Sequence, residues 1–194
     1  IDLQKNVLQY QDKTILVTGA AGSIGSEIVR QLLKFKPHKL ILFDQAETPL
    51  FDLKNELFKT NHTTQFEFLL RSVSNYASVE QCFKAHTIDV VFHAAAYKHV
   101  YMTETTPAAA VLNNILGTKN VVDVAIKNKV AHFVMVSTDK AVNPSSVMGA
   151  SKRIAEMYVA NQAESSNTQL ITTRFGNVLG SNGSVVPIFK EQIA

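Results

Sequence analysis

Short apolar runs alternate with longer amphipathic segments along the whole chain. The apolar runs lie at residues 15–17, 39–44, 65–70, 89–96, 131–137 and 169–179. Runs of this kind are typical of parallel β-strands that are buried on both faces. Between them, apolar residues recur at helical spacing over residues 24–33, 48–59, 77–85, 106–126 and 148–164. The alternation predicts an α/β fold: a doubly wound parallel sheet with a layer of helices on each face, joined by right-handed crossovers.

Two of the expected helices carry start signals. Thr48-Pro49 and Thr106-Pro107 each place a hydroxyl residue at the N-cap and a proline at the first helical position. Proline is tolerated there because the first N–H groups of a helix have no partner within it. The second helix is expected to bury one apolar stripe, formed by Ala108, Val111, Leu112, Ile115, Val122 and Ile126.

Composition limits the class of protein. The chain has 194 residues, 46% apolar and 18% charged, which is the balance of one globular domain and not of a disordered chain. A net charge of +3 is too small to argue for a nucleic-acid or membrane-surface partner. Cys82 is the only cysteine, so an internal disulfide is excluded and a reducing compartment is favoured. We expect this thiol to pack in the core. No apolar run approaches the roughly 20 residues that span a bilayer.

A glycine-rich turn joins the first strand to the first helix. Gly19 permits a tight turn, Gly22 lets the backbone approach a pyrophosphate, and Gly25 lets the helix press against the strand. The helix that follows offers unpaired N–H groups and a partial positive charge to phosphates. We therefore include Ser23 and Ile24, in the same turn, in a predicted dinucleotide site.

Asp44 completes this signal. It closes the second strand 19 residues after Gly25, near the spacing expected of a residue that binds an adenosine ribose. A carboxylate there can accept both ribose hydroxyls and would repel a 2′-phosphate, so NAD is favoured over NADP. The alternative is that Asp44 only caps the following turn.

Residues 137–153 hold the densest group of reactive side chains. Ser137, Thr138, Asp139 and Lys140 follow the fifth apolar run, so they are expected at the carboxyl end of a strand. Further on, Met148 and Lys152 are four residues apart and share one helix face. Charged groups at the rim of a parallel sheet cost free energy to bury unless they have a function. We expect the chemistry here.

Several of these strings resemble the extended short-chain dehydrogenase/reductase superfamily, whose fold is Rossmann-like. The glycine spacing G-x-x-G-x-x-G is one, and HAAAYKHV is similar to the superfamily's second cofactor loop. Small residues in that loop would let the dinucleotide cross the strand ends, and an asparagine in NNILGT resembles the helix residue that braces the active site. The resemblance adds Ala94, Ala95, Ala96, Lys98 and Asn114 to the predicted cofactor site.

STDKAVNP with MGASKR narrows the resemblance further. These strings are similar to the polysaccharide-biosynthesis family of UDP-N-acetylglucosamine 4,6-dehydratases, and to its membrane-anchored subgroup, in which methionine replaces the usual catalytic tyrosine. RFGNVLGSNGSVVPIF extends the match toward the end of the chain. Met148 stands at the tyrosine position, and a thioether cannot transfer protons.

The resemblance implies a set of roles. Lys140 would remove the C5 proton of the sugar, and Asp139 would protonate the departing C6 hydroxyl. For this, the Lys140 pKa must fall and the Asp139 pKa must rise. Thr138 would hydrogen-bond the 4-oxygen, and Lys152 would bind the nicotinamide ribose. The acceptor of the first proton stays open between Asp139, Lys140 and a water molecule.

The same resemblance implies further contacts. Residues expected against the UDP-sugar are His99, Arg174, Asn177, Ser181, Ser184 and Val185. The family's adenine-reading aspartate is replaced here, so Ser72 and Val73 are expected beside the adenine. No metal site is predicted.

Two other functions remain open: a UDP-sugar 4-epimerase, and an NAD-binding domain without catalytic activity. The partners we expect are a UDP-sugar and further copies of the chain, without nucleic acid. Because the chain begins at Ile1 and stops after KEQIA, we expect residues 1–194 to be one Rossmann domain of a longer protein. That protein would have a carboxyl-terminal substrate domain, and any membrane contact would come from segments outside this chain. The expected location is the bacterial cytoplasm or the cytoplasmic face of the inner membrane.

Overall fold

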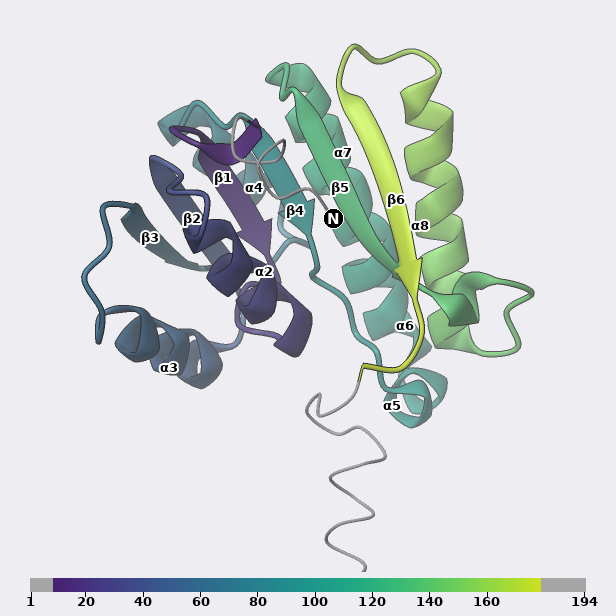
Figure 1. Ribbon diagram of the computed structural model, residues 1–194. Coiled ribbons are helices and arrows are strands. Elements are labelled where there is room, and N and C mark those ends of the chain that lie inside the picture. The colour runs from purple at the N-terminus through teal and green to yellow at the C-terminus, as the bar shows by residue number, and fades with distance from the viewer. Residues whose placement is uncertain (1–8, 179–194) are drawn as a thin grey trace, which may run out of the picture.

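The computed structural model describes residues 9–178. Its centre is a parallel sheet of six strands in the order β3-β2-β1-β4-β5-β6 (Figure 1). The strands are β1 (Thr14–Thr18), β2 (Lys39–Asp44), β3 (Gln65–Leu70), β4 (Val90–His93), β5 (His132–Thr138) and β6 (Gln169–Phe175). The predicted doubly wound α/β fold is confirmed.

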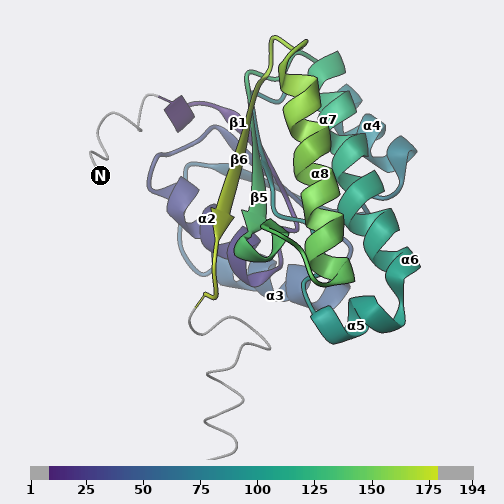
Figure 2. The ribbon, with the colours of Figure 1, turned by 90° about the vertical axis from the view of Figure 1, so that its right-hand side faces the viewer.

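Helices cover both faces of the sheet (Figures 1 and 2). One layer consists of α2 (Ser23–Leu33) and α3 (Glu47–Leu57). The other contains α4 (Tyr76–Ala85), α7 (Gly117–Lys127) and α8 (Val147–Ala163). Shorter elements lie at the carboxyl edge: α5 (Val100–Thr105), α6 (Pro107–Ala110), the π-helix η1 (Val111–Leu116) and the 3₁₀ turn η2 (Asp139–Ala141).

The two layers enclose separate apolar cores. Ile15 and Val17 of β1 face α2 and α3, whereas Leu16 between them faces α4 and α7. This alternation follows from the period of two in a strand, and each face needs its own cover because the strands are apolar on both sides. Cys82, on the inner face of α4, is buried in the core, as predicted. No helix within residues 9–178 is both long and apolar enough to cross a membrane.

The predicted start of α3 is wrong by two residues. Ala46, not Thr48, is the N-cap, because Asp44 Oδ1 accepts the Ala46 N–H at 2.9 Å and so begins the turn earlier. Pro49 is consequently the third helical residue. Its missing N–H is still among those that have no helical partner. The predicted start at Thr106-Pro107 is confirmed.

The predicted apolar stripe after Pro107 is also partly wrong. Val111 and Leu112 are 48% and 52% exposed, and the buried positions in η1 are Asn113 and Asn114. A π-helix bonds each N–H to the fifth carbonyl before it, so its wide turn moves the inward face away from ordinary helical spacing. Val122, beyond this segment, is buried as expected.

Candidate active site

A cavity of about 670 Å³ opens at the carboxyl edge of the sheet. Its walls come from the ends of β1, β2, β4, β5 and β6 and from the first turns of α2 and α8. β2 and β3 lie on one side of β1, and β4, β5 and β6 lie on the other, so the order of the strands switches at β1. Open α/β sheets bind their ligands at such a switch point.

The predicted glycine turn forms one wall. Gly19 has φ of +66°, and a Cβ there would lie 2.5 Å from Ala95 N. A Cβ on Gly25 would lie 2.0 Å from Gly19 O. Side chains are thus excluded at both positions, and the turn packs directly on the β4 loop. Gly22 is the N-cap of α2 and provides no side-chain cap, so the first turn of this helix is open toward the cavity, as a phosphate site requires.

Asp44 faces the same turn. Its Oδ2 accepts the Ala21 N–H at 2.9 Å and its Oδ1 accepts the Ala46 N–H at 2.9 Å. The carboxylate therefore fixes the glycine turn and the start of α3 at once. Each oxygen keeps a second lone pair, so the capping role and a ribose contact are compatible.

Asn114 braces the loop after β4. Its Oδ1 accepts the Tyr97 N–H at 2.7 Å, and its Nδ2 donates to Tyr97 O at 3.0 Å and to Ser151 Oγ at 3.0 Å. The asparagine thus joins the β4 loop to α8 without lining the cavity. Its neighbour Asn113 does line the cavity, although nothing in the sequence pattern singled it out.

Thr138, Asp139 and Lys140 lie together at the end of β5. Thr138 Oγ1 donates to Asp139 Oδ1 at 2.9 Å, and Lys140 Nζ lies 3.3 Å from the same oxygen. Lys140 Nζ also donates to Asn177 Oδ1 at 3.2 Å. The predicted acid, base and hydroxyl are therefore in contact, and Asn177 from the loop after β6 joins them.

The electrostatics of Asp139 differ from the expectation. The hydrogen bonds from Thr138 and then from Lys140 hold the pKa of this carboxyl below its ordinary value. An acid role needs the opposite direction. Asp139 is exposed and does not line the cavity, so a bound sugar and a covering segment would have to remove water from it before its pKa could rise.

Met148 and Lys152 share one face of α8, as predicted, and both are buried at the cavity wall. Lys152 Nζ donates to Val136 O at 2.8 Å. Burial lowers the pKa of Lys152 to about 8, while the Glu156 carboxylate one turn further opposes that shift. An ammonium that titrates near neutral pH is well suited to a reaction that moves protons.

His93, at the end of β4, was not identified from the sequence. Its Nδ1 lies 2.7 Å from Thr18 Oγ1 and its Nε2 lies 2.9 Å from Thr118 Oγ1. Burial and then the Lys152 charge lower the pKa of His93 to about 3. The imidazole is neutral at pH 7 and joins β1, β4 and α7 beneath the cavity.

Most of the predicted site residues line this one cavity. The exceptions within residues 9–178 are Ser72, Asn114, Asp139 and Arg174. Ser72 Oγ lies 2.8 Å from Ser74 Oγ, so this hydroxyl is hydrogen-bonded within its own loop. Arg174 is paired with Glu156 on the α8 side of the sheet. Ser181, Ser184 and Val185 lie outside the described residues.

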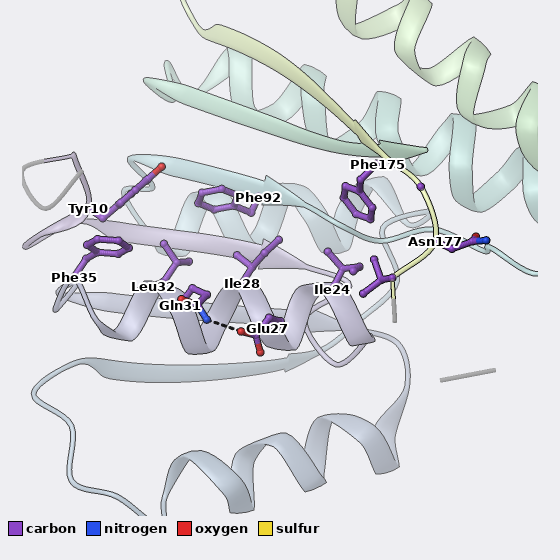
Figure 3. Close-up of a pocket in the computed structure, with 12 residues that line it drawn as sticks. Tyr10, Ile24, Glu27, Ile28, Gln31, Leu32, Phe35, Phe92, Phe175 and Asn177 are labelled. Atoms are coloured by element: carbon purple, nitrogen blue, oxygen red, sulfur yellow. Dashed lines mark hydrogen bonds between the residues drawn. The ribbon is translucent and has the colours of Figure 1, made fainter. Parts of the chain in front are cut away.

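A second pocket, of about 430 Å³, lies on the α2 face of the sheet. Figure 3 shows Ile28 and Leu32 of α2 opposite Phe92 of β4, with Tyr10 and Phe35 at one end and Phe175 at the other. Its walls are mostly apolar and Glu27 is the one carboxylate among its lining residues, so it is not a candidate for chemistry. Nor does any group of three or more His, Cys, Asp and Glu side chains in the described part of the chain suit a metal ion.

The family profile described as "Polysaccharide biosynthesis protein" matches residues 15–194. The chain is 51% identical over 187 residues to the capsular polysaccharide biosynthesis protein CapD of Staphylococcus aureus, covering 95% of this chain and 31% of that protein. It is 38% identical over 191 residues to the UDP-glucose 4-epimerase of Rickettsia canadensis, covering 95% of this chain and 54% of that enzyme. The chain thus spans between about a third and about half of these relatives.

Two solved structures agree with the fold. The structure of Pen from Bacillus thuringiensis superimposes with a TM-score of 0.89 at 38% identity, covering 95% of this chain and 58% of that one. The complex of UDP-glucose 4-epimerase with NAD from Thermus thermophilus superimposes with a TM-score of 0.80 at 26% identity, covering 93% of this chain and 62% of that one.

Proposed function

The chain belongs to the polysaccharide biosynthesis protein family, and we propose that it is the NAD-binding domain of a UDP-N-acetylglucosamine 4,6-dehydratase. The contact of Thr138, Asp139 and Lys140 at the end of β5 carries the proposal. A dehydration needs a base and an acid near one pair of sugar carbons. Lys140 and Asp139 provide them, and the Thr138 hydroxyl donates to the same Asp139 oxygen that Lys140 contacts.

The cavity fits a dinucleotide. Gly22 lines the cavity and, as the N-cap of α2, places no side chain in front of that helix, so a pyrophosphate can approach the start of α2 there. Asp44 lies beside the turn, where its carboxylate would accept hydrogen bonds from the adenosine ribose. Its charge favours NAD over NADP. When bound, NAD supplies the acceptor and later the donor of one hydride.

The elimination falls to three side chains at the end of β5. Lys140 Nζ takes the C5 proton, and the released electron pair forms the C5–C6 double bond as the C6–oxygen bond breaks. Asp139 gives its proton to the departing hydroxyl, which leaves as water. Thr138 donates to the 4-oxygen, whose ketone form makes the C5 proton acidic. These steps require Lys140 to be neutral and Asp139 to be protonated at the start.

Lys152 and Met148 form the inner wall. Lys152 binds the nicotinamide ribose and, through its charge, favours release of the proton from the 4-hydroxyl. Met148 packs against the sugar and transfers no proton. That first proton goes to Asp139, Lys140 or a water molecule.

The sugar and phosphate contacts come from the rim. Lys98, His99 and Asn177 line the cavity, and we assign Lys98 to the cofactor phosphates and the other two to the UDP-sugar. Ser181, Ser184 and Val185 are proposed contacts of the same substrate. Arg174 is better explained by its pairing with Glu156 than by a sugar contact.

The whole protein would contain more than this domain. We propose that a carboxyl-terminal domain completes the sugar pocket and that membrane segments outside this chain hold the protein at the cytoplasmic face of a bacterial inner membrane. We also propose a homo-oligomer. Exposed apolar side chains on η1 and α8 support that: Val111, Leu112, Ile154 and Met157.

One experiment separates the candidate functions. The full-length protein is mixed with NAD⁺ and UDP-N-acetylglucosamine, and the nucleotide-sugar is followed by mass spectrometry. A dehydratase removes the mass of one water. If the full-length protein binds NAD but leaves the sugar unchanged, the non-catalytic alternative is correct and the proposed function is wrong.

The second candidate is a UDP-sugar 4-epimerase. It is favoured by the identity of 38% to the Rickettsia canadensis epimerase. An epimerase inverts C4 and needs no acid and base for C5 and C6, so it gives Asp139 and Lys140 no function. A product of unchanged mass with an inverted C4 would establish this candidate.

A further inference from the structure

The side chains of Gln45 and Tyr97 meet across the cavity. Gln45 follows β2, and Tyr97 lies in the loop after β4. Gln45 Nε2 donates to Tyr97 Oη at 3.0 Å, and both residues line the cavity. Because β1 lies between β2 and β4, this hydrogen bond crosses the carboxyl end of β1, where the glycine turn stands.

Both ends of this bridge have a fixed backbone. Asn114 holds the N–H and the carbonyl of Tyr97 at 2.7 and 3.0 Å. On the other side, Asp44, directly before Gln45, is held by the N–H groups of Ala21 and Ala46. The two side chains therefore project from rigid supports, and rotation of the side chains alone can open the bridge.

We propose that Gln45 and Tyr97 form a clasp over the adenosine half of the bound dinucleotide and slow its release. This inference rests on the proposed function, because it places the adenosine ribose at Asp44, next to Gln45. The proposed reaction also explains why slow cofactor release would be useful. The reaction takes a hydride from the sugar and returns it within one cycle, so a cofactor that leaves between the two steps strands an oxidised sugar in the site.

The expected effect is set by one hydrogen bond. A neutral, exposed hydrogen bond of this kind slows dissociation by about 3-fold to 10-fold when it must break before the ligand leaves. The ring of Tyr97 and the stem of Gln45 remain in the variants below, so their packing is retained.

The test measures the release of NADH from the full-length protein. NADH fluorescence is followed after mixing with excess NAD⁺ for Tyr97→Phe, Gln45→Met and the double variant. Tyr101→Phe is the matched control, since it makes the same change nearby on a side chain that is 77% exposed and outside the cavity. Thermal unfolding of each variant checks that the fold is kept.

Each single variant should release NADH about 3-fold to 10-fold faster, and the double variant no faster than the quicker single one, because both changes remove the same bond. Tyr101→Phe should match the wild type. Single variants that release NADH at the wild-type rate would overturn the clasp, and so would two effects that multiply. The water-loss experiment on the wild type is independent of these rates, so it can fail or succeed separately.

Discussion

Arg174 of β6 and Glu156 of α8 form a bidentate salt bridge. Arg174 Nε donates to Glu156 Oε1 at 2.8 Å and Nη2 donates to Oε2 at 2.5 Å. Glu156 is one helical turn beyond Lys152, and Arg174 is three residues before Asn177. The pair therefore ties α8, which carries Lys152, to β6, the strand that leads to Asn177, the hydrogen-bond partner of Lys140.

Glu156→Gln should weaken the fold and change the titration of Lys152. The side chain of Glu156 is 5% exposed and that of Arg174 is 41% exposed, so losing the pair should cost about 1–2 kcal/mol, less than a fully buried pair. Without the carboxylate, the Lys152 pKa should fall below its value of about 8. Urea unfolding measures the first effect, and the pH dependence of NAD⁺ binding the second. Arg153→Gln is the control, since it removes only the outer partner of Glu156 at 3.3 Å.

The Glu156 carboxylate also predicts how the free energy of unfolding changes at acidic pH. Burial acts to raise the pKa of Glu156, but the hydrogen bonds from Arg174 and its other neighbours outweigh burial and hold it at about 2, below the ordinary 4.5. The unfolded chain therefore binds the proton first as pH falls. The stabilisation is complete above pH 4.5 and is lost between pH 4.5 and 2. Wild type should lose more free energy of unfolding over this interval than Glu156→Gln, and equal losses would contradict the pairing.

Lys152 predicts a pH dependence of the same sign at the alkaline end, where stability again rises with pH. Its pKa is lowered by burial from 10.5 to about 8, so between these values the unfolded chain binds more protons than the folded one. Stability from this group should rise as pH increases from 8 to 10.5, by about 1–3 kcal/mol in total. Lys152→Met should remove the rise and weaken NAD⁺ binding. A variant that keeps the wild-type pH profile of unfolding would refute the burial of this ammonium.

Gly19→Ala should disrupt the turn. The residue has φ of +66°, and its added Cβ would meet Ala95 N at 2.5 Å. We expect a loss of about 1–3 kcal/mol in the free energy of unfolding, together with weaker NAD⁺ binding. Gly22→Ala is a suitable comparison because its φ is −71° and its nearest contact is 3.3 Å. Equal unfolding energies for the two variants would show that the turn is not strained in this way.

Met148→Leu tests whether the methionine has a chemical role. Both side chains are apolar and similar in volume, so the buried wall should be retained with a cost below about 1.5 kcal/mol. Water elimination should stay within about 3-fold of wild type, because neither side chain can transfer a proton. A loss beyond about 100-fold, with NAD⁺ binding intact, would mean that the thioether takes part in the reaction.

Local patterns predicted the parts of the site that lie close together in the sequence. The glycine turn, Asp44 and the pair Met148 and Lys152 follow from spacing within one strand–helix–strand unit or one helix, and the structure places them on one cavity. The layered fold was predicted in the same way, because the alternation of apolar runs and amphipathic segments is also a local pattern.

The remaining features depend on contacts between distant segments. The bridge from Gln45 to Tyr97 and the pair of Glu156 with Arg174 form only after strands and helices pack. The π-helical turn at η1 could not be read from helical spacing, and it reversed which side chains are buried there. The lowered pKa of Asp139 has a local cause, the hydrogen bonds from its neighbours Thr138 and Lys140, but the sequence does not give the directions of those side chains.

The central claim concerns Asp139 and Lys140, and the double variant Asp139→Asn with Lys140→Met tests it most directly. In the full-length protein with NAD⁺ and UDP-N-acetylglucosamine, loss of water should fall by at least about 100-fold, while NAD⁺ binding stays near wild type. Asp52→Asn with Lys59→Met, exposed residues outside the cavity, should leave the rate unchanged. A double variant at positions 139 and 140 that eliminates water at the wild-type rate would contradict the account.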